Sequence, residues 1–221
     1  MNKFISPSIM CGDWANFDKN IKSFEENSID YIHVDIMDGE FVPNFAFGTD
    51  FVSYLHKRTN IPLDIHLMVT NPNIKIDFFK FNPNDIVTFH IEASHNPLNT
   101  IKKIHSIPAK AGIALKPKTD VETLIPYIEQ IELVLILTVH PGFAGQKLIP
   151  YTLNKIKQTR KLADYLNPNL LIEVDGNVSF ENSGKMSQLG ANVFVAGTSS
   201  LFNNADFNTN VVKLRNSIIR N

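Results

Sequence analysis

Short apolar segments alternate with longer amphipathic segments along the whole chain. The apolar segments predict strands near residues 3–9, 30–36, 62–68, 85–91, 109–115, 132–139, 170–175 and 192–196. Apolar residues at helical spacing follow them and predict helices near residues 14–28, 49–59, 73–81, 97–107, 120–130, 147–165, 179–189 and 205–219. Strands that alternate with helices form a parallel sheet. Eight such units in 221 residues predict an α/β fold, a single (β/α)8 TIM barrel that spans residues 1–221.

Polar residues stand at the carboxyl ends of several predicted strands. His33 and Asp35 end the second strand, and they point the same way because alternate residues of a strand share a face. His66 ends the third strand and Asp175 the seventh. In a (β/α)8 barrel these ends meet at one face, where active sites form. Two imidazoles and two carboxylates suit one divalent ion, and Zn²⁺, Fe²⁺, Co²⁺ and Mn²⁺ fit equally well.

A histidine in an apolar strand has a simpler explanation as well. Taken alone, His33 or His66 is more often a core residue with an ordinary hydrogen bond than a metal ligand. However, four buried polar groups without partners would each cost about 1–3 kcal/mol. The combination therefore favours a metal site.

Composition and charge argue against several classes of protein. The chain is 43% hydrophobic, which is enough for a large core. Its formal net charge of −1 provides no basic surface for nucleic acid. No apolar run is long enough to span a membrane. Cys11 is the only cysteine, so no disulfide can form within the chain. These features predict a cytoplasmic protein without nucleic-acid or membrane partners.

Small residues follow the last three predicted strands. Glycines and hydroxyl residues let backbone N–H groups approach an anion, and the loops after strands seven and eight commonly bind phosphate in this fold. A single glycine of this kind is most simply a turn residue. Three such loops at one rim favour a phosphorylated small molecule as the ligand. The candidate phosphate-binding residues are Gly142, Phe143, Ala144, Gly145, Gly176, Asn177, Gly197, Thr198 and Ser199.

A series of motifs in a fixed order runs through the chain. They read Ser6-Pro7-Ser8, His33-Val34-Asp35-Ile36-Met37-Asp38-Gly39 with Phe41-Val42-Pro43-Asn44, Asp64-Ile65-His66-Leu67-Met68, Thr138-Val139-His140-Pro141-Gly142-Phe143-Ala144-Gly145-Gln146, and Ile172-Glu173-Val174-Asp175-Gly176. Together they are highly specific, and the chain resembles the ribulose-phosphate 3-epimerase family over almost its whole length. The resemblance implies a metal-dependent 3-epimerase of a phosphorylated ketose on a ribulose-phosphate-binding barrel.

The resemblance also implies roles for individual residues. By matching positions, His33, Asp35, His66 and Asp175 would hold the metal ion, and the two aspartates would also form the acid–base pair. The chemistry asks for such a pair, because inverting a carbon next to a ketone requires proton removal on one face and proton return on the other. A cation would stabilise the charge of the enediolate. Which aspartate starts protonated is left open.

Substrate contacts follow from the same match. Ser8 would touch the substrate together with His66. Met37 and Met68 stand beside the proposed ligands and would either shield the enediolate from water or fill the core. Leu137 stands where the family often has a further methionine, which weakens the case for a full methionine cap. His140 is expected at the rim, facing solvent.

Departures from the usual family pattern point to one branch. They comprise Met10-Cys11-Gly12, Ala144, Asn177 and the run from Gly197 to Asn203. These residues look like those of allulose-6-phosphate 3-epimerases, which act on the six-carbon analogue. We therefore expect conversion of D-allulose 6-phosphate to D-fructose 6-phosphate, with D-ribulose 5-phosphate to D-xylulose 5-phosphate as the alternative. One carbon unit is worth about 1–3 kcal/mol of discrimination, so the two substrates should overlap.

Two rival functions fit the sequence less well. A decarboxylase resembling the orotidine-phosphate enzyme needs an Asp-x-Lys-x-x-Asp array, and Asp35-Ile36-Met37 lacks the lysine. A non-catalytic sugar-phosphate-binding barrel would keep the phosphate loops while losing acids or ligands, whereas this chain keeps all four. The family resemblance further suggests a homo-oligomer.

Overall fold

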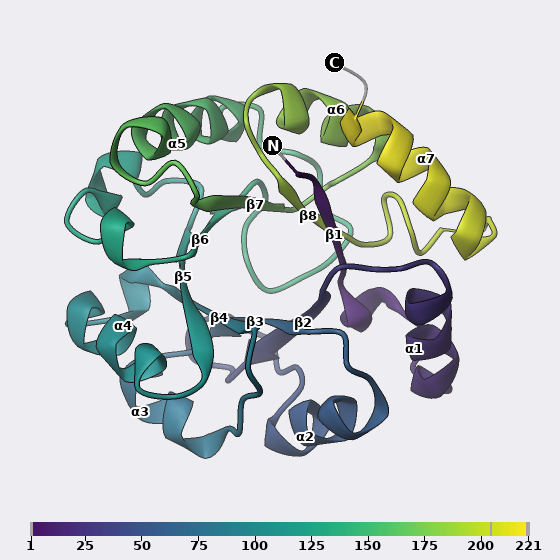
Figure 1. Ribbon diagram of the computed structural model, residues 1–221, viewed down its shortest axis with the longest axis horizontal. Coiled ribbons are helices and arrows are strands. Elements are labelled where there is room, and N and C mark those ends of the chain that lie inside the picture. Colours follow the sequence, from purple (N-terminus) through teal and green to yellow (C-terminus); the bar gives the residue numbers. More distant parts are fainter. Residues whose placement is uncertain (1, 204, 220–221) are drawn as a thin grey trace.

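Figure 1 shows the computed structural model, in which parallel strands form a barrel and helices lie around it. The structure describes residues 2–203 and 205–219, so residues 1, 204, 220 and 221 of the predicted domain lie outside the described residues. The strands within this part of the chain form one eight-stranded parallel sheet in the order β1-β8-β7-β6-β5-β4-β3-β2. They are β1 (Phe4–Pro7), β2 (Ile32–Met37), β3 (Leu63–Met68), β4 (Asp85–His90), β5 (Ala109–Leu115), β6 (Leu133–Leu137), β7 (Leu171–Asp175) and β8 (Val193–Ala196). The predicted barrel is confirmed.

The helices follow the predicted amphipathic segments, with one exception. They are α1 (Phe17–Glu26), α2 (Thr49–Arg58), α3 (Pro72–Lys75), α4 (Pro97–His105), α5 (Thr152–Leu166), α6 (Phe180–Gln188) and α7 (Phe207–Ile219). Side-chain caps set three of the starts: Asn16, Asn96 and Ser179 each accept a hydrogen bond from the backbone N–H three residues later.

The prediction of a helix near residues 120–130 is wrong. This segment forms two short 3-10 turns, Val121–Leu124 and Ile128–Gln130. Pro126 lies between them and has no N–H to donate, so a continuous helical ladder cannot form there. The predicted helix near 73–81 is likewise shortened to α3 and a 3-10 turn at Ile76–Phe78.

The barrel closes between its first two strands. Ser8, just beyond β1, forms a parallel bridge with His33 of β2. Below it, the backbone N–H of Tyr31 donates to the carbonyl of Ile5. The closure therefore lies beside a proposed metal ligand.

Alternation along the strands divides the buried residues into two sets. Residues such as Ile65 and Val87 point outward and form the main core with the helices. Inward-pointing residues such as Ile86 and Leu135 form a separate apolar cluster inside the barrel. Polar residues also point inward, on β1 to β4 and on β7, and Asp64 and Glu173 are fully buried among them. The barrel interior is thus polar on one side and apolar on the other.

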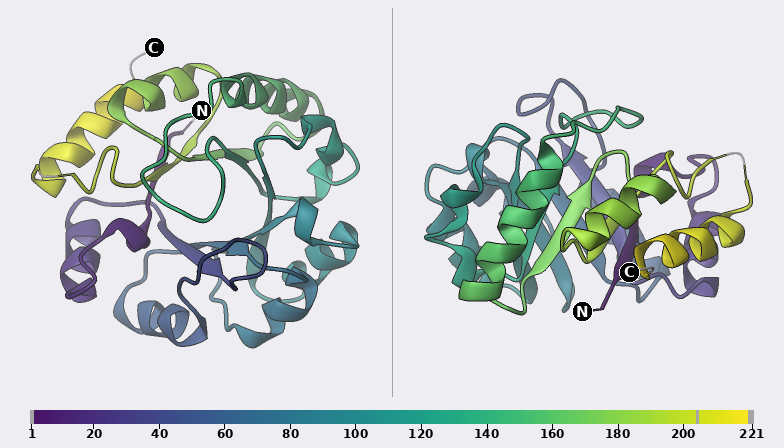
Figure 2. Two further views of the ribbon diagram at one scale, coloured as in Figure 1. Left: turned by 180° about the vertical axis from the view of Figure 1, so that it is seen from behind. Right: turned by 90° about the horizontal axis from the view of Figure 1, so that it is seen from above.

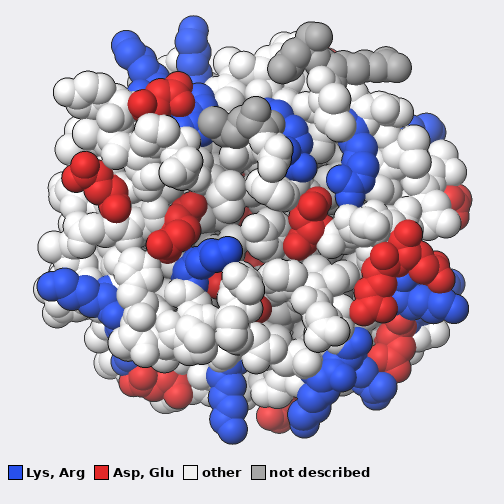
Figure 3. Space-filling view, in the orientation of Figure 1, with Lys and Arg blue, Asp and Glu red and all other residues white. Residues whose placement is uncertain are grey.

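Long loops mark one end of the barrel. In Figure 2 (right), the loops after β2 and β6 project from the end opposite to the N-terminus, and Figure 2 (left) shows the second of them over the centre of the barrel. The face seen in Figure 3 carries lysines and arginines interspersed with acidic residues. Among the described residues, no helix has the length and apolar character that crossing a membrane requires.

Phe24 tests the packing of helices on the barrel. Its side chain is fully buried, and its ring lies 5.5 Å from that of Phe207 and 6.2 Å from that of Phe202. We expect Phe24→Ala to lower the free energy of unfolding by about 3–5 kcal/mol, because it leaves a cavity. Phe78, which is 64% exposed, serves as the control. Urea denaturation measures both, and an equal loss in Phe78→Ala would contradict this account.

Candidate active site

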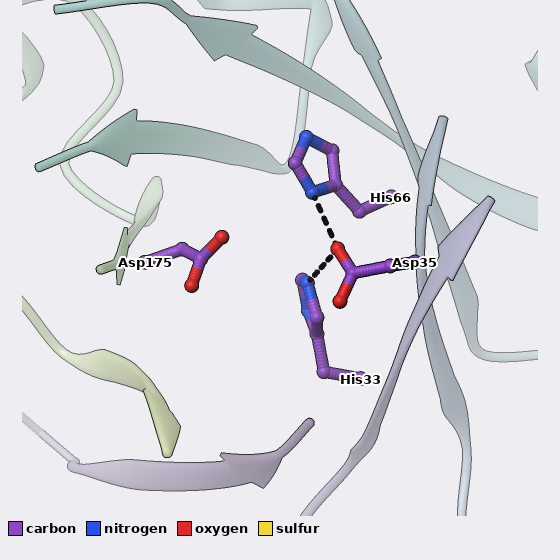
Figure 4. Close-up of side chains that lie close together, drawn as sticks. All are labelled: His33, Asp35, His66 and Asp175. Atoms are coloured by element: carbon purple, nitrogen blue, oxygen red, sulfur yellow. Dashed lines mark hydrogen bonds and ion pairs between the residues drawn. The ribbon is translucent and has the colours of Figure 1, made fainter. Parts of the chain in front are cut away.

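The strand register brings four predicted residues together at the loop-bearing end of the barrel. β2 and β3 pair so that Asp35 lies opposite His66, two residues beyond the closure of β1 on His33. Asp175 ends β7 on the far side of the barrel. Figure 4 shows Asp175 across an open space from the other three side chains. The four donor atoms lie within 4.8 Å of one another.

Distances within this group support a site for a cation. Asp35 Oδ1 lies 3.3 Å from His33 Nε2 and 3.1 Å from His66 Nδ1 (Figure 4). His33 Nε2 is buried and makes no hydrogen bond within the described part of the chain. Burial of a nitrogen without a partner costs free energy, and a bound metal ion would remove this cost by accepting the lone pair of the nitrogen. Two imidazole nitrogens and two carboxylates could therefore hold a metal ion here.

The two aspartates experience different surroundings. Burial raises the pKa of Asp35, but the imidazoles of His33 and His66 outweigh burial and lower that pKa below the usual range. Burial, and then the charge of Asp35, raise the pKa of Asp175 to about 6. Asp175 therefore holds a proton more readily than Asp35 does.

Below the site, a second group of polar residues holds His33. Asp64 Oδ2 lies 2.6 Å from His33 Nδ1 and accepts a hydrogen bond from Ser6 Oγ at 2.9 Å. Glu173 Oε1 lies 4.0 Å from the same imidazole nitrogen. Burial and the neighbouring charge of Asp64 raise the pKa of Glu173 well above its usual value. Because Asp64 takes Nδ1–H, the Nε2 atom of His33 is the one that faces the site.

His66 is held from the opposite side by a third histidine. His66 Nε2 lies 2.9 Å from His90 Nε2, and His90 Nδ1 lies 3.2 Å from Glu92 Oε2. Burial raises the pKa of Glu92, but hydrogen bonds from His90, Thr119 and the Lys116 backbone reverse this and lower it to about 2. Glu92 is therefore a carboxylate at neutral pH.

The predicted phosphate-binding residues line one pocket with the acids. The empty space of this pocket, including the solvent at its open mouth, is about 580 Å³. The hydrogen bonds of the described residues leave the backbone N–H groups of Gly176, Asn177 and Gly197 without a protein acceptor. All nine residues that the sequence predicts to bind phosphate line this pocket: Gly142, Phe143, Ala144, Gly145, Gly176, Asn177, Gly197, Thr198 and Ser199.

Side-chain amides join the loops around this pocket. Asn44 Nδ2 donates to the carbonyl of Gly142 at 2.7 Å, so the loops after β2 and β6 are in contact. Asn177 Nδ2 donates to the carbonyl of Gln146 at 2.8 Å, and Asn182 Nδ2 donates to Asn177 Oδ1. The Asn177 side chain is thus engaged in joining the loops.

The remaining predicted residues also reach the pocket. Ser8 Oγ donates to Asp35 Oδ2 at 3.2 Å. Met37 and Met68 line the pocket and are almost fully buried, in a cluster with Val42. His140 lies at the rim and is exposed, as its place in the sequence predicts.

Sequence reasoning missed the residues that support the ligands. Four such residues have no predicted role: His90, Glu92, Asp64 and Glu173. The position of His90 in its strand could have identified it. His90 ends the fourth strand as His66 ends the third, so the same period-2 rule points it at the barrel mouth. Asp64 and Glu173 point into the barrel interior, and their partners depend on strand register.

Substitution of Gly176 tests whether the loops that are predicted to bind phosphate need their present shape. Its φ is +114°, and a Cβ placed on it would lie 2.7 Å from the side chain of Val139. We expect Gly176→Ala to cost about 1–3 kcal/mol of stability and to weaken binding of a sugar phosphate, since the loop must move. At Gly48 a Cβ would meet nothing within 4 Å, so Gly48→Ala is the control for sugar-phosphate binding. Because Gly48 is the N-cap of α2, where glycine is preferred to alanine, the control is read on binding and not on stability. Thermal unfolding and calorimetric titration measure both effects, and a neutral Gly176→Ala would contradict the prediction.

Comparison with solved structures supports the barrel. KGPDC from Streptococcus mutans superposes with a TM-score of 0.71 at 11% identity, covering 97% of this chain and 96% of that chain. Orotidine 5'-phosphate decarboxylase from Pyrococcus horikoshii OT3 gives a TM-score of 0.66 at 13% identity, with 97% and 99% covered. At such low identity these likenesses show the fold alone.

Sequence relatives go further than the fold. The family model described as "Ribulose-phosphate 3 epimerase family" matches residues 4–202. A ribulose-phosphate 3-epimerase of Bacillus subtilis is 39% identical over 214 residues, covering 96% of this chain and 98% of the relative. One of Aquifex aeolicus is 33% identical, with 98% and 97% covered. The chloroplastic ribulose-5-phosphate-3-epimerase of Arabidopsis thaliana is 39% identical, with 92% and 73% covered. The chain therefore belongs to the ribulose-phosphate 3-epimerase family and is an isomerase, a carbohydrate epimerase.

Proposed function

We propose that the chain epimerises a phosphorylated ketose at C3, with Asp35 and Asp175 as the two proton-transferring groups. The observation that carries this proposal is that their carboxyl groups face each other across the pocket from β2 and β7 (Figure 4). A planar enediolate between them would have one carboxyl group on each side. One aspartate removes the C3 proton, and the other returns a proton to the opposite face.

His33, Asp35, His66 and Asp175 are proposed to hold one divalent ion. The orphaned nitrogen of His33 and the close approach of the four donor atoms support this assignment. When bound, the ion would stabilise the negative charge that develops on the substrate oxygens during proton transfer. Zn²⁺, Fe²⁺, Co²⁺ and Mn²⁺ all fit this donor set.

The pocket walls are proposed to place C3 between the carboxyl groups. Ser8, whose hydroxyl lies against Asp35, would contact the sugar. Met37 and Met68 would exclude water from the reacting carbon, because they line the pocket and are almost fully buried. The unused backbone N–H groups of Gly176, Asn177 and Gly197 would bind the phosphate dianion.

We propose D-ribulose 5-phosphate as the preferred substrate, with D-xylulose 5-phosphate as its product. Curated relatives that cover nearly the whole chain carry the name ribulose-phosphate 3-epimerase, so they favour this alternative over the six-carbon substrate expected from the sequence departures. D-Allulose 6-phosphate, which would give D-fructose 6-phosphate, stays the second candidate on the strength of Ala144 and Asn177. Both residues lie in the phosphate loops, where an extra carbon would alter the fit. A cytoplasmic location and a homo-oligomer remain predictions from the sequence.

Exchange of the C3 proton in D₂O, followed by NMR, tests the reaction and the substrate together. We expect exchange on ribulose 5-phosphate to exceed that on allulose 6-phosphate by about 10- to 100-fold, the discrimination that one carbon unit supplies. Chelation should stop exchange on both, and added Mn²⁺ or Zn²⁺ should restore it. A preference for allulose 6-phosphate would reverse the substrate assignment. No exchange on either compound, with metal bound, would refute the epimerase proposal.

Replacement of Asp175 tests its role in proton transfer. Asp175→Asn keeps the shape of the side chain and cannot take a proton, so we expect net conversion of ribulose 5-phosphate to xylulose 5-phosphate to fall about 10²- to 10⁴-fold, because inversion needs both groups. Substrate binding, measured by calorimetry, should persist. Asp50→Asn, a change at an exposed residue in the first turn of α2, is the control and should leave the conversion unchanged. Full conversion by Asp175→Asn would remove Asp175 from the mechanism.

A further inference from the structure

Two histidine nitrogens that face each other at hydrogen-bond distance limit where protons can lie. His66 Nε2 and His90 Nε2 are 2.9 Å apart, and both imidazoles are fully buried. A hydrogen bond between them needs a proton on one nitrogen and a lone pair on the other. The tautomers of the two rings are therefore coupled, and whatever fixes the proton on one ring fixes it on the other.

Glu92 decides which ring donates. Its Oε1 accepts a hydrogen bond from the backbone N–H of Lys116 at 2.8 Å and another from the hydroxyl of Thr119, while its Oε2 lies 3.2 Å from His90 Nδ1. Donors thus surround the carboxylate, which has no proton to give. His90 must then carry its proton on Nδ1 and offer the lone pair of Nε2 to His66.

The same hydrogen bonds, from Glu92 through His90 to His66, determine whether the His66 nitrogen that faces the proposed metal site carries a proton. If His66 donates through Nε2–H, its Nδ1 atom is free to present a lone pair toward the site. Nδ1 is the atom that lies 3.1 Å from Asp35 Oδ1, among the proposed ligands. Metal-binding histidines commonly donate their second N–H to a partner that sets the tautomer and the ring orientation.

Packing keeps the third histidine in place. The ring of Phe41 lies 4.7 Å from that of His90. Nζ of Lys116, a residue of the loop after β5, lies 3.7 Å from the centroid of the Phe41 ring. Phe41 belongs to the loop after β2, and Lys116 follows β5. The ring of His90, at the end of β4, is therefore packed under the loop after β2, which Lys116 contacts in turn. The imidazole therefore has little freedom to turn away from His66.

We propose that His90 and Glu92 are positioning residues for metal binding: Glu92 holds the proton of His90 on Nδ1, which holds the proton of His66 on Nε2 and presents His66 Nδ1 to the ion. This inference rests on the metal site of the proposed function. It adds a second layer of residues, which no part of the proposed reaction has used. The two residues act through His66 and touch no substrate.

Glu92→Gln tests the proposal because the amide can adopt only one orientation without a clash. The Lys116 N–H requires an oxygen at the position of Oε1, so the NH₂ group must occupy the position of Oε2 and donate to His90 Nδ1. His90 then carries its proton on Nε2, and His66 keeps a proton on Nδ1, the atom that would bind metal. We expect the affinity for Co²⁺, measured by competition with a chelator, to fall about 10- to 100-fold.

A matched control exists at the other end of the barrel. Glu132, just before β6, also accepts from a backbone N–H, that of Ala111 at 2.8 Å, and lies 3.1 Å from a histidine nitrogen, His105 Nε2. Glu132→Gln makes the same chemical change far from the metal site. We expect its Co²⁺ affinity to match that of the unmodified protein within about twofold, since the proposed ligands are untouched.

Two further measurements separate positioning from general damage. Nitrogen-15 NMR of the unmodified, Zn²⁺-loaded protein should show His90 protonated at Nδ1 and His66 at Nε2. In a His90→Phe background, adding Glu92→Gln should cause no further loss of Co²⁺ affinity, because Glu92 acts through His90.

The outcomes that would overturn the inference are distinct from failure of the proposed function. Unchanged Co²⁺ affinity in Glu92→Gln, an equal loss in Glu132→Gln, a full additional loss in the His90→Phe background, or the opposite tautomers would each refute it. An unmodified protein that binds no divalent ion would instead refute the proposed metal site, and the inference would fall with it.

Discussion

The pairing of buried polar side chains inside the barrel is the constraint on which the rest of the structure depends. His33, Asp64 and Glu173 are fully buried in a medium where an unpaired charge is costly. Their contacts run between β2, β3 and β7, so these contacts form only in one strand register. A slip of one residue would turn every one of them toward the helices. The polar interior therefore fixes the register as firmly as the outer hydrophobic core does.

The two halves of the barrel contribute different things to the site. The half made of β1 to β4 supplies imidazoles and carboxylates, whereas the half with β5, β6 and β8 is lined by residues such as Ala114, Leu135 and Val195. Asp175, on β7, is the acid that stands apart from the others. This asymmetry places three of the proposed ligands on one side of the pocket and apolar walls on the other, with the carboxyl group of Asp175 facing across.

The loops add the part of the site that the barrel does not supply. Asn44 and Asn177 use their amide groups to tie the loop after β6 to its two neighbours. Because these bonds engage carbonyls and side chains, they leave the backbone N–H groups of Gly176, Asn177 and Gly197 without an acceptor among the described residues. Rigid strands thus hold the acids and ligands, while braced loops hold the groups that suit a phosphate.

The amino-acid sequence by itself determined the barrel and the four residues that meet at the candidate site. Strand periodicity shows that His33 and Asp35 point the same way, and parallel topology brings the ends of distant strands to one face. Local rules failed where a single residue broke a pattern, as Pro126 did within the helix predicted near 120–130. Here the periodicity of apolar residues persisted although the hydrogen-bond ladder could not.

Only the tertiary structure decided how the ligands are supported. His66 lies opposite Thr88 in the register of β3 and β4, yet its ring meets His90 at hydrogen-bond distance. That contact depends on the lateral approach of side chains across neighbouring strands, which no spacing within one strand encodes. The connection onward to Glu92 and Lys116 joins the segments that directly follow β4 and β5. Sequence periodicity fixes the direction of each side chain, whereas the partner it meets depends on register, barrel closure and loop packing.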